Sequence, residues 1–347
     1  MSTAVLPVAS TRRRLGPVLI SLGVLAMAAV GSLTLGPAGI DPWGAVREAL
    51  DHLPLVSLDS GLTTQEAAIV WQIRVPRLVL AGLVGATLAG SGAAYQGVFR
   101  NPLADPYLLG VAAGAGLGAT VAIVSGLPSS MIPPLAFVGA VLAVVAAYGL
   151  ASLGGSRRSG ATLILSGVAV AAFFTALQTY LQQQHAETIR QVFSWILGRL
   201  GTTGWGDVRT LLPYAIASWV VLFAYRRHLD VMAVGEEEAS TLGIEPARVR
   251  LVVVAGATLG AAAAVAVSGL IAFVGIIVPH IVRLATGPSH RTLLPVALTG
   301  GAAFLMVADL AARTVQPGGE LPIGVVTAFV GAPFFAFILA TRREVAT

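Results

Sequence analysis

The chain has 347 residues, of which 56% are hydrophobic and only 11% are charged, compared with about a quarter charged in ordinary soluble domains. A soluble core of this size does not need so much apolar surface, which argues against a water-soluble enzyme. Cysteine is absent and all 21 basic residues are arginine. Disulfides, thiolate nucleophiles and the lysine of a standard P-loop ATPase are therefore excluded.

Apolar windows recur along the whole chain, and a membrane-spanning helix needs about 20 such residues. The hydropathy pattern predicts about ten spans, the first retained rather than cleaved and the eighth short. Their expected ranges are 15–35, 75–98, 107–126, 131–152, 161–183, 208–225, 249–270, 273–286, 294–312 and 322–341. The sequence thus predicts an all-α polytopic membrane protein, with one transmembrane domain over residues 15–341 between tails at 1–14 and 342–347.

Arginine placement predicts the orientation, because cytoplasmic segments of membrane proteins carry an excess of basic residues. With the N-terminus in the cytoplasm, fourteen arginines fall inside and seven outside. The inside set is Arg12, Arg13, Arg14, Arg100, Arg157, Arg158, Arg226, Arg227, Arg248, Arg250, Arg283, Arg291, Arg342 and Arg343. The outside set is Arg47, Arg74, Arg77, Arg190, Arg199, Arg209 and Arg313. Both termini are therefore expected in the cytoplasm.

Glycines at four-residue spacing form ridges, at Gly110, Gly114 and Gly118 and again at Gly256 and Gly260. Small residues let helix backbones approach closely in lipid. The ridges indicate a tightly packed helical bundle.

The predicted spans carry few ionisable groups, although ion-coupled carriers and membrane enzymes usually place such groups at mid-bilayer. Asp309 has Arg313 one helical turn further on, a spacing more typical of a structural pair than of a functional one. No zinc-binding His-Glu-x-x-His motif and no chain of carboxylates or histidines is present in the sequence. The chain offers a pathway without an evident energy source, so it is either passive or powered by a partner.

Two polar segments interrupt the apolar pattern on the predicted cytoplasmic side. Residues 100–106 place prolines on both sides of a short polar turn, which fits either a tight interhelical turn or a rigid constriction at the pore mouth. Residues 235–244 begin with three glutamates and end near Gly243, as a short surface helix would. That helix could dock a soluble partner or be a solvated loop.

Two further segments depart from simple spans. In residues 269–280 a glycine and a proline lie within an apolar run, which indicates a broken or tightly turned helix pair. On the outer side, Trp71, Arg74 and Arg77 precede or open the second span. They fit an interfacial anchor or a docking point for an acidic partner, which Arg313 could join.

Taken together and in order, five motifs resemble the FecCD family of permease subunits, found in bacterial ABC importers for iron-siderophores, haem and vitamin B12. They are Trp-x-Ile-Arg-x-Pro-Arg at 71–77, Arg-Asn-Pro-Leu-Ala-Asp-Pro at 100–106, Gly-Glu-Glu-Glu-Ala-x-x-Leu-Gly at 235–243, Gly-Leu-Ile-Ala-Phe-Val-Gly-x-x-x-Pro-His-x-x-Arg at 269–283, and Glu-Leu-Pro-Ile-Gly at 320–324. The resemblance covers about residues 70–341, and the first 70 residues match no family motif.

The resemblance implies ten transmembrane helices per subunit in the bacterial cytoplasmic membrane and a pathway formed by two identical or homologous permease subunits. It also implies two cytoplasmic ABC ATPase subunits, an extracellular or periplasmic substrate-binding protein, contact with membrane lipids and no nucleic acid. The expected complex holds ATP-Mg on the partner ATPases, with no catalytic residue, metal or cofactor in this chain.

Carried over by motif, the resemblance assigns three sets of residues. The ATPase-coupling set is Glu236, Glu237, Glu238, Ala239, Leu242 and Gly243; the cytoplasmic gate is Asn101 and Leu103; the binding-protein docking set is Arg74, Arg77 and Arg313. In the variable stretch 185–207, His185 and Arg190 could contact haem or an anionic chelate, although a surface role is expected.

The predicted function is a transport subunit that moves an iron chelate through a chamber lined by small apolar side chains. A siderophore is the default substrate and haem is possible; a cobalamin permease of the same family is the alternative. An ion-coupled secondary carrier and an intramembrane enzyme are rival classes, and co-purification of an ATPase would separate them from an importer subunit.

Overall fold

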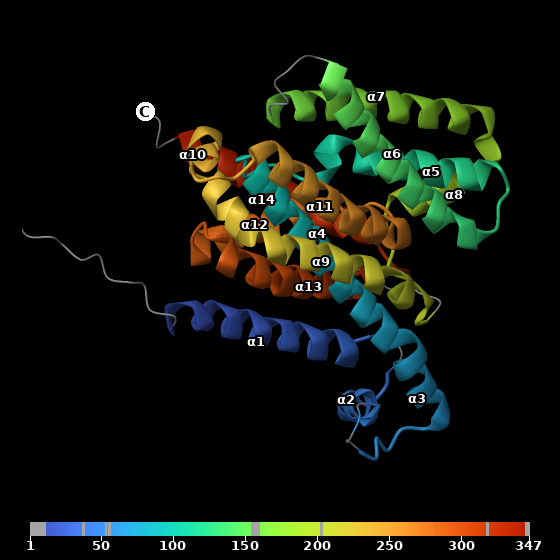
Figure 1. Cartoon of the computed structure of the whole chain (residues 1–347). Helices are drawn as coiled ribbons and strands as arrows, with labels where there is room; N and C mark the ends of the chain where they lie inside the picture. The colour runs from blue at the N-terminus through green and yellow to red at the C-terminus, as the bar shows by residue number, and fades with distance from the viewer. Residues whose placement is uncertain are drawn as a thin grey trace, which may run out of the picture.

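The computed structural model describes residues 12–36, 39–52, 54, 57–153, 160–201, 204–316 and 319–343. Arg157 and Arg158, most of the 1–14 tail and most of the 342–347 tail lie outside these ranges. The regular elements of the described part are helical and most run side by side (Figure 1). The helices are α1 (Arg12–Thr34), α2 (Pro42–Asp51), α3 (Thr64–Ile69), α4 (Val75–Val98), α5 (Val111–Val124), α6 (Ile132–Leu153), α7 (Gly160–Gln184), α8 (Ile189–Ile196), α9 (Gly206–Met232), α10 (Glu236–Thr241), α11 (Pro246–Ser268), α12 (Val274–Thr286), α13 (His290–Thr314) and α14 (Ile323–Arg343).

All the predicted spans are found as helices, which confirms an all-α polytopic membrane protein. Seven helices are long and apolar enough to cross a membrane, and Val111–Val124, Val274–Thr286 and Ile323–Ile338 are shorter apolar helices. The span expected at 107–126 begins later than predicted. Pro106–Leu109 forms a 3-10 turn, and Gly110 then takes a positive φ of 86° before α5 starts.

The short helices α2 and α3 were not predicted, and capping side chains define where they begin. Asp41 accepts a hydrogen bond from the Gly44 backbone and starts α2. Thr63 and Glu66 form a capping box at the start of α3. A π-helical turn, Val70–Arg74, then joins α3 to α4 without a break.

The centre of the bundle is α4, which packs against α9, α11, α12 and α13. Close approach depends on glycine: a Cβ on Gly85 would collide with the Gly301 carbonyl, and one on Gly114 with the Gly139 carbonyl. The glycine ridge of α5 therefore packs against α6, as expected for helix packing in lipid.

The bundle has two distinct ends. The start of α1, the last turn of α14 and α10 lie at one end, here called the α10 end. Helices α2 and α3 lie at the opposite end, here called the α2 end (Figure 1). Both ends of the described chain are thus on the same side of the bundle, as the predicted even number of spans requires.

Candidate translocation site: chamber, gate and coupling helix

The chain breaks between α11 and α12, as the 269–280 segment predicted. Gly269 has a φ of +70°, and Phe273, also at +70°, caps the start of α12. Tyr107 fixes the segment between them: its hydroxyl donates to the Ile271 carbonyl at 3.0 Å and accepts from the Ile271 amide at 3.3 Å. These bonds satisfy backbone groups that non-helical chain would otherwise leave unpaired inside a membrane protein.

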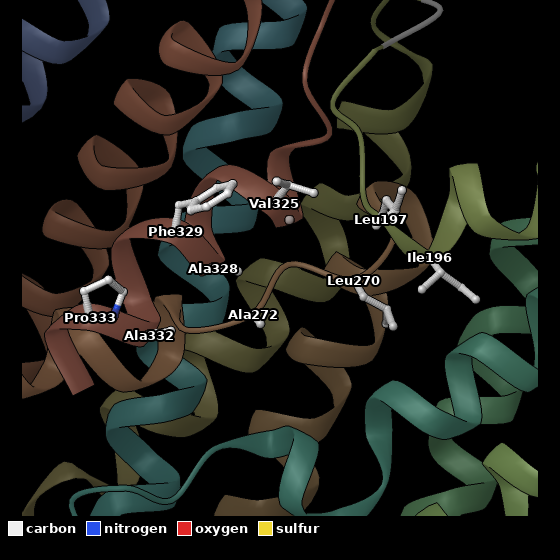
Figure 2. A pocket seen from close by; sticks show the side chains of 10 residues that line it. Ile196, Leu197, Leu270, Ala272, Val325, Ala328, Phe329, Ala332 and Pro333 are labelled. Carbon is white, nitrogen blue, oxygen red and sulfur yellow. The ribbon is translucent and has the colours of Figure 1, made fainter. Parts of the chain in front are cut away.

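An apolar cavity of about 630 Å³ lies beside this break. Its walls come from three segments: the end of α8, the break itself and α14 (Figure 2). The lining residues are Ile196, Leu197, Leu270, Ala272, Gly324, Val325, Ala328, Phe329, Ala332 and Pro333. Such a wall has no charged side chain to hold a ligand tightly, which suits a compartment that a substrate passes through.

The two predicted gate residues lie in the connection from α4 to α5. The Asn101 side chain accepts from the Leu103 amide at 3.0 Å, and both residues are half-buried. Gly97, at the end of α4, is close to Leu229 of α9 and to His290 of α13, which places this connection toward the α10 end. Their role as a gate stays a prediction.

The same connection links the gate residues to the chamber wall. Asp105 accepts from the Tyr107 amide at 2.8 Å, and Tyr107 holds Ile271 between two residues that line the cavity. Asp105 is buried, and burial raises the pKa of its carboxyl to about 6. Sequence reasoning did not single out Tyr107, although it follows directly on the 100–106 motif.

The 235–244 segment forms the predicted short helix, α10. Gly243 has a positive φ of 78°, and the Ile244 amide returns to the Ala239 carbonyl at 3.1 Å, which closes the helix end. Ala239 is buried against the bundle, whereas the Leu242 side chain is 69% exposed.

The three glutamates of α10 have different surroundings. Glu236 pairs with Arg250 of α11, whereas Glu237 and Glu238 are exposed. The helix is therefore fixed on one side and presents Leu242 and acidic groups on the other. The coupling role of this surface stays a prediction.

The three predicted docking arginines are engaged within the chain at the α2 end. Arg77 donates to Asp309 at 2.8 Å and to Glu320 at 2.8 Å. Arg313 also lies 3.4 Å from Asp309. The Arg77 hydrogen bond lowers the pKa of the Glu320 carboxyl.

Arg74 and Arg313 hold the end of α1. Arg74 donates to the Leu33 carbonyl at 2.9 Å, and Arg313 donates to the Ser32 carbonyl and, at 2.7 Å, to the Ser32 hydroxyl. They occupy carbonyls of the last turn of α1, which have no partner within the helix. A docking role for these arginines stays a prediction, and a partner carboxylate would have to compete with these internal contacts.

A polar contact that sequence reasoning missed ties α4 to α12. Arg283 donates to the Gln96 side chain at 3.1 Å, and Gln96 donates to the Gly275 carbonyl at 3.1 Å. The sequence signals are a glutamine near the end of a largely apolar helix and Arg283, the last residue of the 269–283 motif. The two residues predicted as possible ligand contacts are both near the surface. His185 follows the last residue of α7, with its Nδ1 atom 3.1 Å from the Leu181 carbonyl, and Arg190 is exposed on α8.

The helical bundle, with seven helices long and apolar enough to cross a membrane in its described part, is that of a polytopic membrane protein. The chain belongs to the FecCD transport family, whose model matches residues 24–341. It is thus a permease subunit of the ABC importer type, a multi-pass protein of the cytoplasmic membrane, and not itself an ATPase.

Named relatives cover most or all of the chain. The cobalamin import system permease protein BtuC of Halobacterium salinarum is 42% identical over 98% of this chain and 94% of its own length. The Fe(3+) dicitrate permease FecD of Escherichia coli is 37% identical over 79% of this chain and 86% of its own. The hemin permease HmuU of Yersinia pestis is 37% identical over 79% of this chain and 84% of its own length.

A solved structure supports the same fold. It is described as an inward-facing conformation of a metal-chelate type ABC transporter, with a TM-score of 0.80 and 28% sequence identity. The match covers 93% of this chain and 98% of that chain.

Proposed function

We propose that this chain is the permease subunit of an ATP-driven importer for a bulky metal chelate, and that the chelate is cobalamin. The observation that carries the choice is the near end-to-end similarity to a cobalamin permease, at 42% identity over 98% of this chain. The iron-dicitrate permease FecD and the hemin permease HmuU are 37% identical over 79% of it, and the iron-citrate permease YfmE of Bacillus subtilis is 34% identical over 94%. Iron chelates, the default expectation from the family resemblance, become the rival substrates.

The cavity supports transport of a bulky ligand with little affinity of its own. Its walls are aliphatic and aromatic, and α14 contributes Phe329, which is largely exposed on the flank of the bundle. A second permease subunit placed against α14 would close the chamber from that side. Affinity would then reside in the substrate-binding protein.

The energy would come from two partner ATPases that bind ATP-Mg in the cytoplasm. This assigns the α10 end to the cytoplasmic side, in agreement with the excess of arginine predicted there. Leu242 and the exposed glutamates of α10 would seat in the ATPase surface, and closure of the ATPases would shift the connection that carries Asn101 and Leu103.

The cargo can be tested through ATPase stimulation. The complex, purified with its ATPases in nanodiscs, would be mixed with cognate binding protein loaded with cobalamin, a ferric siderophore or hemin. Cobalamin-loaded protein should stimulate hydrolysis most strongly. Stimulation by an iron chelate and not by cobalamin would overturn the cobalamin assignment while leaving the importer class intact.

Docking of the binding protein on the arginines has its own test, because Glu320 competes for Arg77. Glu320→Gln removes one carboxylate from Arg77 at a side chain that is about half exposed. If Arg77 receives a carboxylate of the binding protein, the variant should bind that protein more tightly and with a steeper dependence on salt. Unchanged affinity and salt dependence would mean that these arginines serve only the fold.

A further inference from the structure

Helix α2 has one exposed face that carries a distinctive set of side chains. Trp43, Arg47 and Leu50 are spaced four and three residues apart, so they share one side of the helix. Trp43 is 70% exposed and Leu50 is 40% exposed, and Arg47 is exposed as well. A tryptophan, an arginine and a leucine on one face form an amphipathic surface.

The remaining faces of α2 are fixed to the protein. Ala45 is buried in a cluster with Leu33 at the end of α1, Val70 of the π-helical turn and Val75 at the start of α4. On the polar side, the Glu48 carboxylate accepts from Ser60 and the Asp51 carboxylate from the Leu58 amide, each at 2.8 Å.

An aromatic stack secures the end of α2. The His52 ring stacks on Trp71 with 3.7 Å between centroids, and Trp71 in turn contacts Trp205 at 5.1 Å. The helix is therefore held in one position, and its exposed face has a defined direction.

That position is at the edge of the spanning region. In Figure 1 α2 is seen nearly end-on beside the end of α1, whereas the long helices run across the view. Its axis thus crosses the direction of the spans and lies roughly in the plane of the membrane. Met27 and Val30 of α1, and Leu35 just after it, are also exposed apolar side chains.

We propose that α2 is an interfacial helix that rests in the lipid headgroup region at the α2 end, with its Trp43–Arg47–Leu50 face against lipid. Tryptophan and arginine favour this depth, since each combines an apolar body with a polar group. The packing of α2 beside the end of α1, a candidate spanning helix with exposed apolar side chains, favours lipid over a protein as the occupant. The helix would fix the depth of α1 in the membrane, where Arg74 and Arg313 already hold the end of α1.

The absence of cysteine from the sequence allows a direct test with single labels. Trp43→Cys and Leu50→Cys would each carry a nitroxide spin label in the full chain, reconstituted in liposomes. Met27→Cys on the exposed flank of α1 is the hydrocarbon reference, and Gln65→Cys on α3 is the water reference. The measurement is relaxation of each label by oxygen, which concentrates in the bilayer, relative to a water-soluble nickel chelate.

The labels at 43 and 50 should show an oxygen-to-nickel ratio several-fold above that at 65 and below that at 27. Two labels protect the test against a local effect of losing Trp43. Ratios equal to that at 65 would overturn the proposal. So would nickel access that is lost only when binding protein is added, because the face would then be a protein docking surface.

Discussion

Asp309 shows how a charged residue is accommodated at the α2 end of the bundle. Its side chain is only 1% exposed, and Arg77 and Arg313 both lie within ion-pair distance. Burying a carboxylate is tolerated when cations and hydrogen bonds compensate for lost hydration. The i,i+4 spacing predicted the Arg313 contact, whereas Arg77 is 232 residues away in sequence and could not have been inferred.

Arg77→Gln should therefore destabilise the protein by about 3–5 kcal/mol, because Asp309 loses its bidentate partner while staying buried. The measurement is denaturant unfolding of the purified chain in detergent. Glu320→Gln is the matched control and should cost at most about 1 kcal/mol, since an exposed ion pair contributes little. Equal effects of the two substitutions would contradict the account of Asp309.

Asp105 predicts a pH dependence of stability. Its carboxyl has a pKa of about 6 in the folded protein, raised by burial above the ordinary 3.8. Ionisation of Asp105 therefore destabilises the folded state. This destabilisation is absent below the ordinary pKa, grows as the pH rises and is complete above about pH 6. The difference between the two pKa values corresponds to a loss of about 3 kcal/mol of folding stability at high pH.

Asp105→Asn keeps an oxygen that can accept from the Tyr107 amide and removes the charge. The variant should be more stable than the parent at pH 8, by up to about 3 kcal/mol, and by about half as much at pH 5. Unfolding curves of both proteins at the two pH values measure this. A gain that does not change with pH would show that Asp105 is not a buried ionised carboxylate.

At the scale of elements, the exposed surface of α10 allows its predicted role in coupling to the ATPase to be tested by mutation. Leu242→Asp places a charge where an apolar side chain is expected to seat in the ATPase, while Ala239 still anchors the helix to the bundle. The variant should keep its thermal stability but lose most substrate uptake per ATP hydrolysed. Leu58→Asp, at an exposed leucine of the opposite end, is the control and should transport normally. Full uptake by Leu242→Asp would remove the coupling role.

The elements that sequence predicted best are those defined by long apolar windows, since only helices can span a bilayer as single segments. The short helices α2 and α8 were missed because they are too short to form such a window. The late start of α5 was missed as well: the positive φ of Gly110 and the preceding 3-10 turn become evident only in the structure. No sequence signal marked the π-helical turn before α4.

In the candidate site, too, local features were predicted from the sequence and long-range ones were not. The break at 269–273 and the closed end of α10 follow from the local glycines Gly269 and Gly243, which act through the backbone of their own segment, whereas Pro279 lies inside α12. The chamber could not be located from the sequence, because α8, the break and α14 meet only through tertiary packing. The partners of Arg74, Arg77 and Arg313 that are distant in sequence were missed for the same reason.

At the scale of the whole molecule, a chain of contacts links the cavity to the predicted gate residues. The chamber lies beside the α11–α12 break, Tyr107 joins that break to the connection that carries Asn101 and Leu103, and α10 presents its free surface at one end. The described part of the chain has no group of three His, Asp or Glu residues placed to hold a metal ion.

The most direct test is uptake of radiolabelled cobalamin into proteoliposomes that contain this chain with its co-purified partners and the cognate binding protein. The account predicts accumulation that requires ATP and binding protein and is not reduced by excess ferric siderophore or hemin. Uptake of an iron chelate alone would contradict the substrate. Uptake driven by an ion gradient, with no ATPase co-purifying, would contradict the importer mechanism itself.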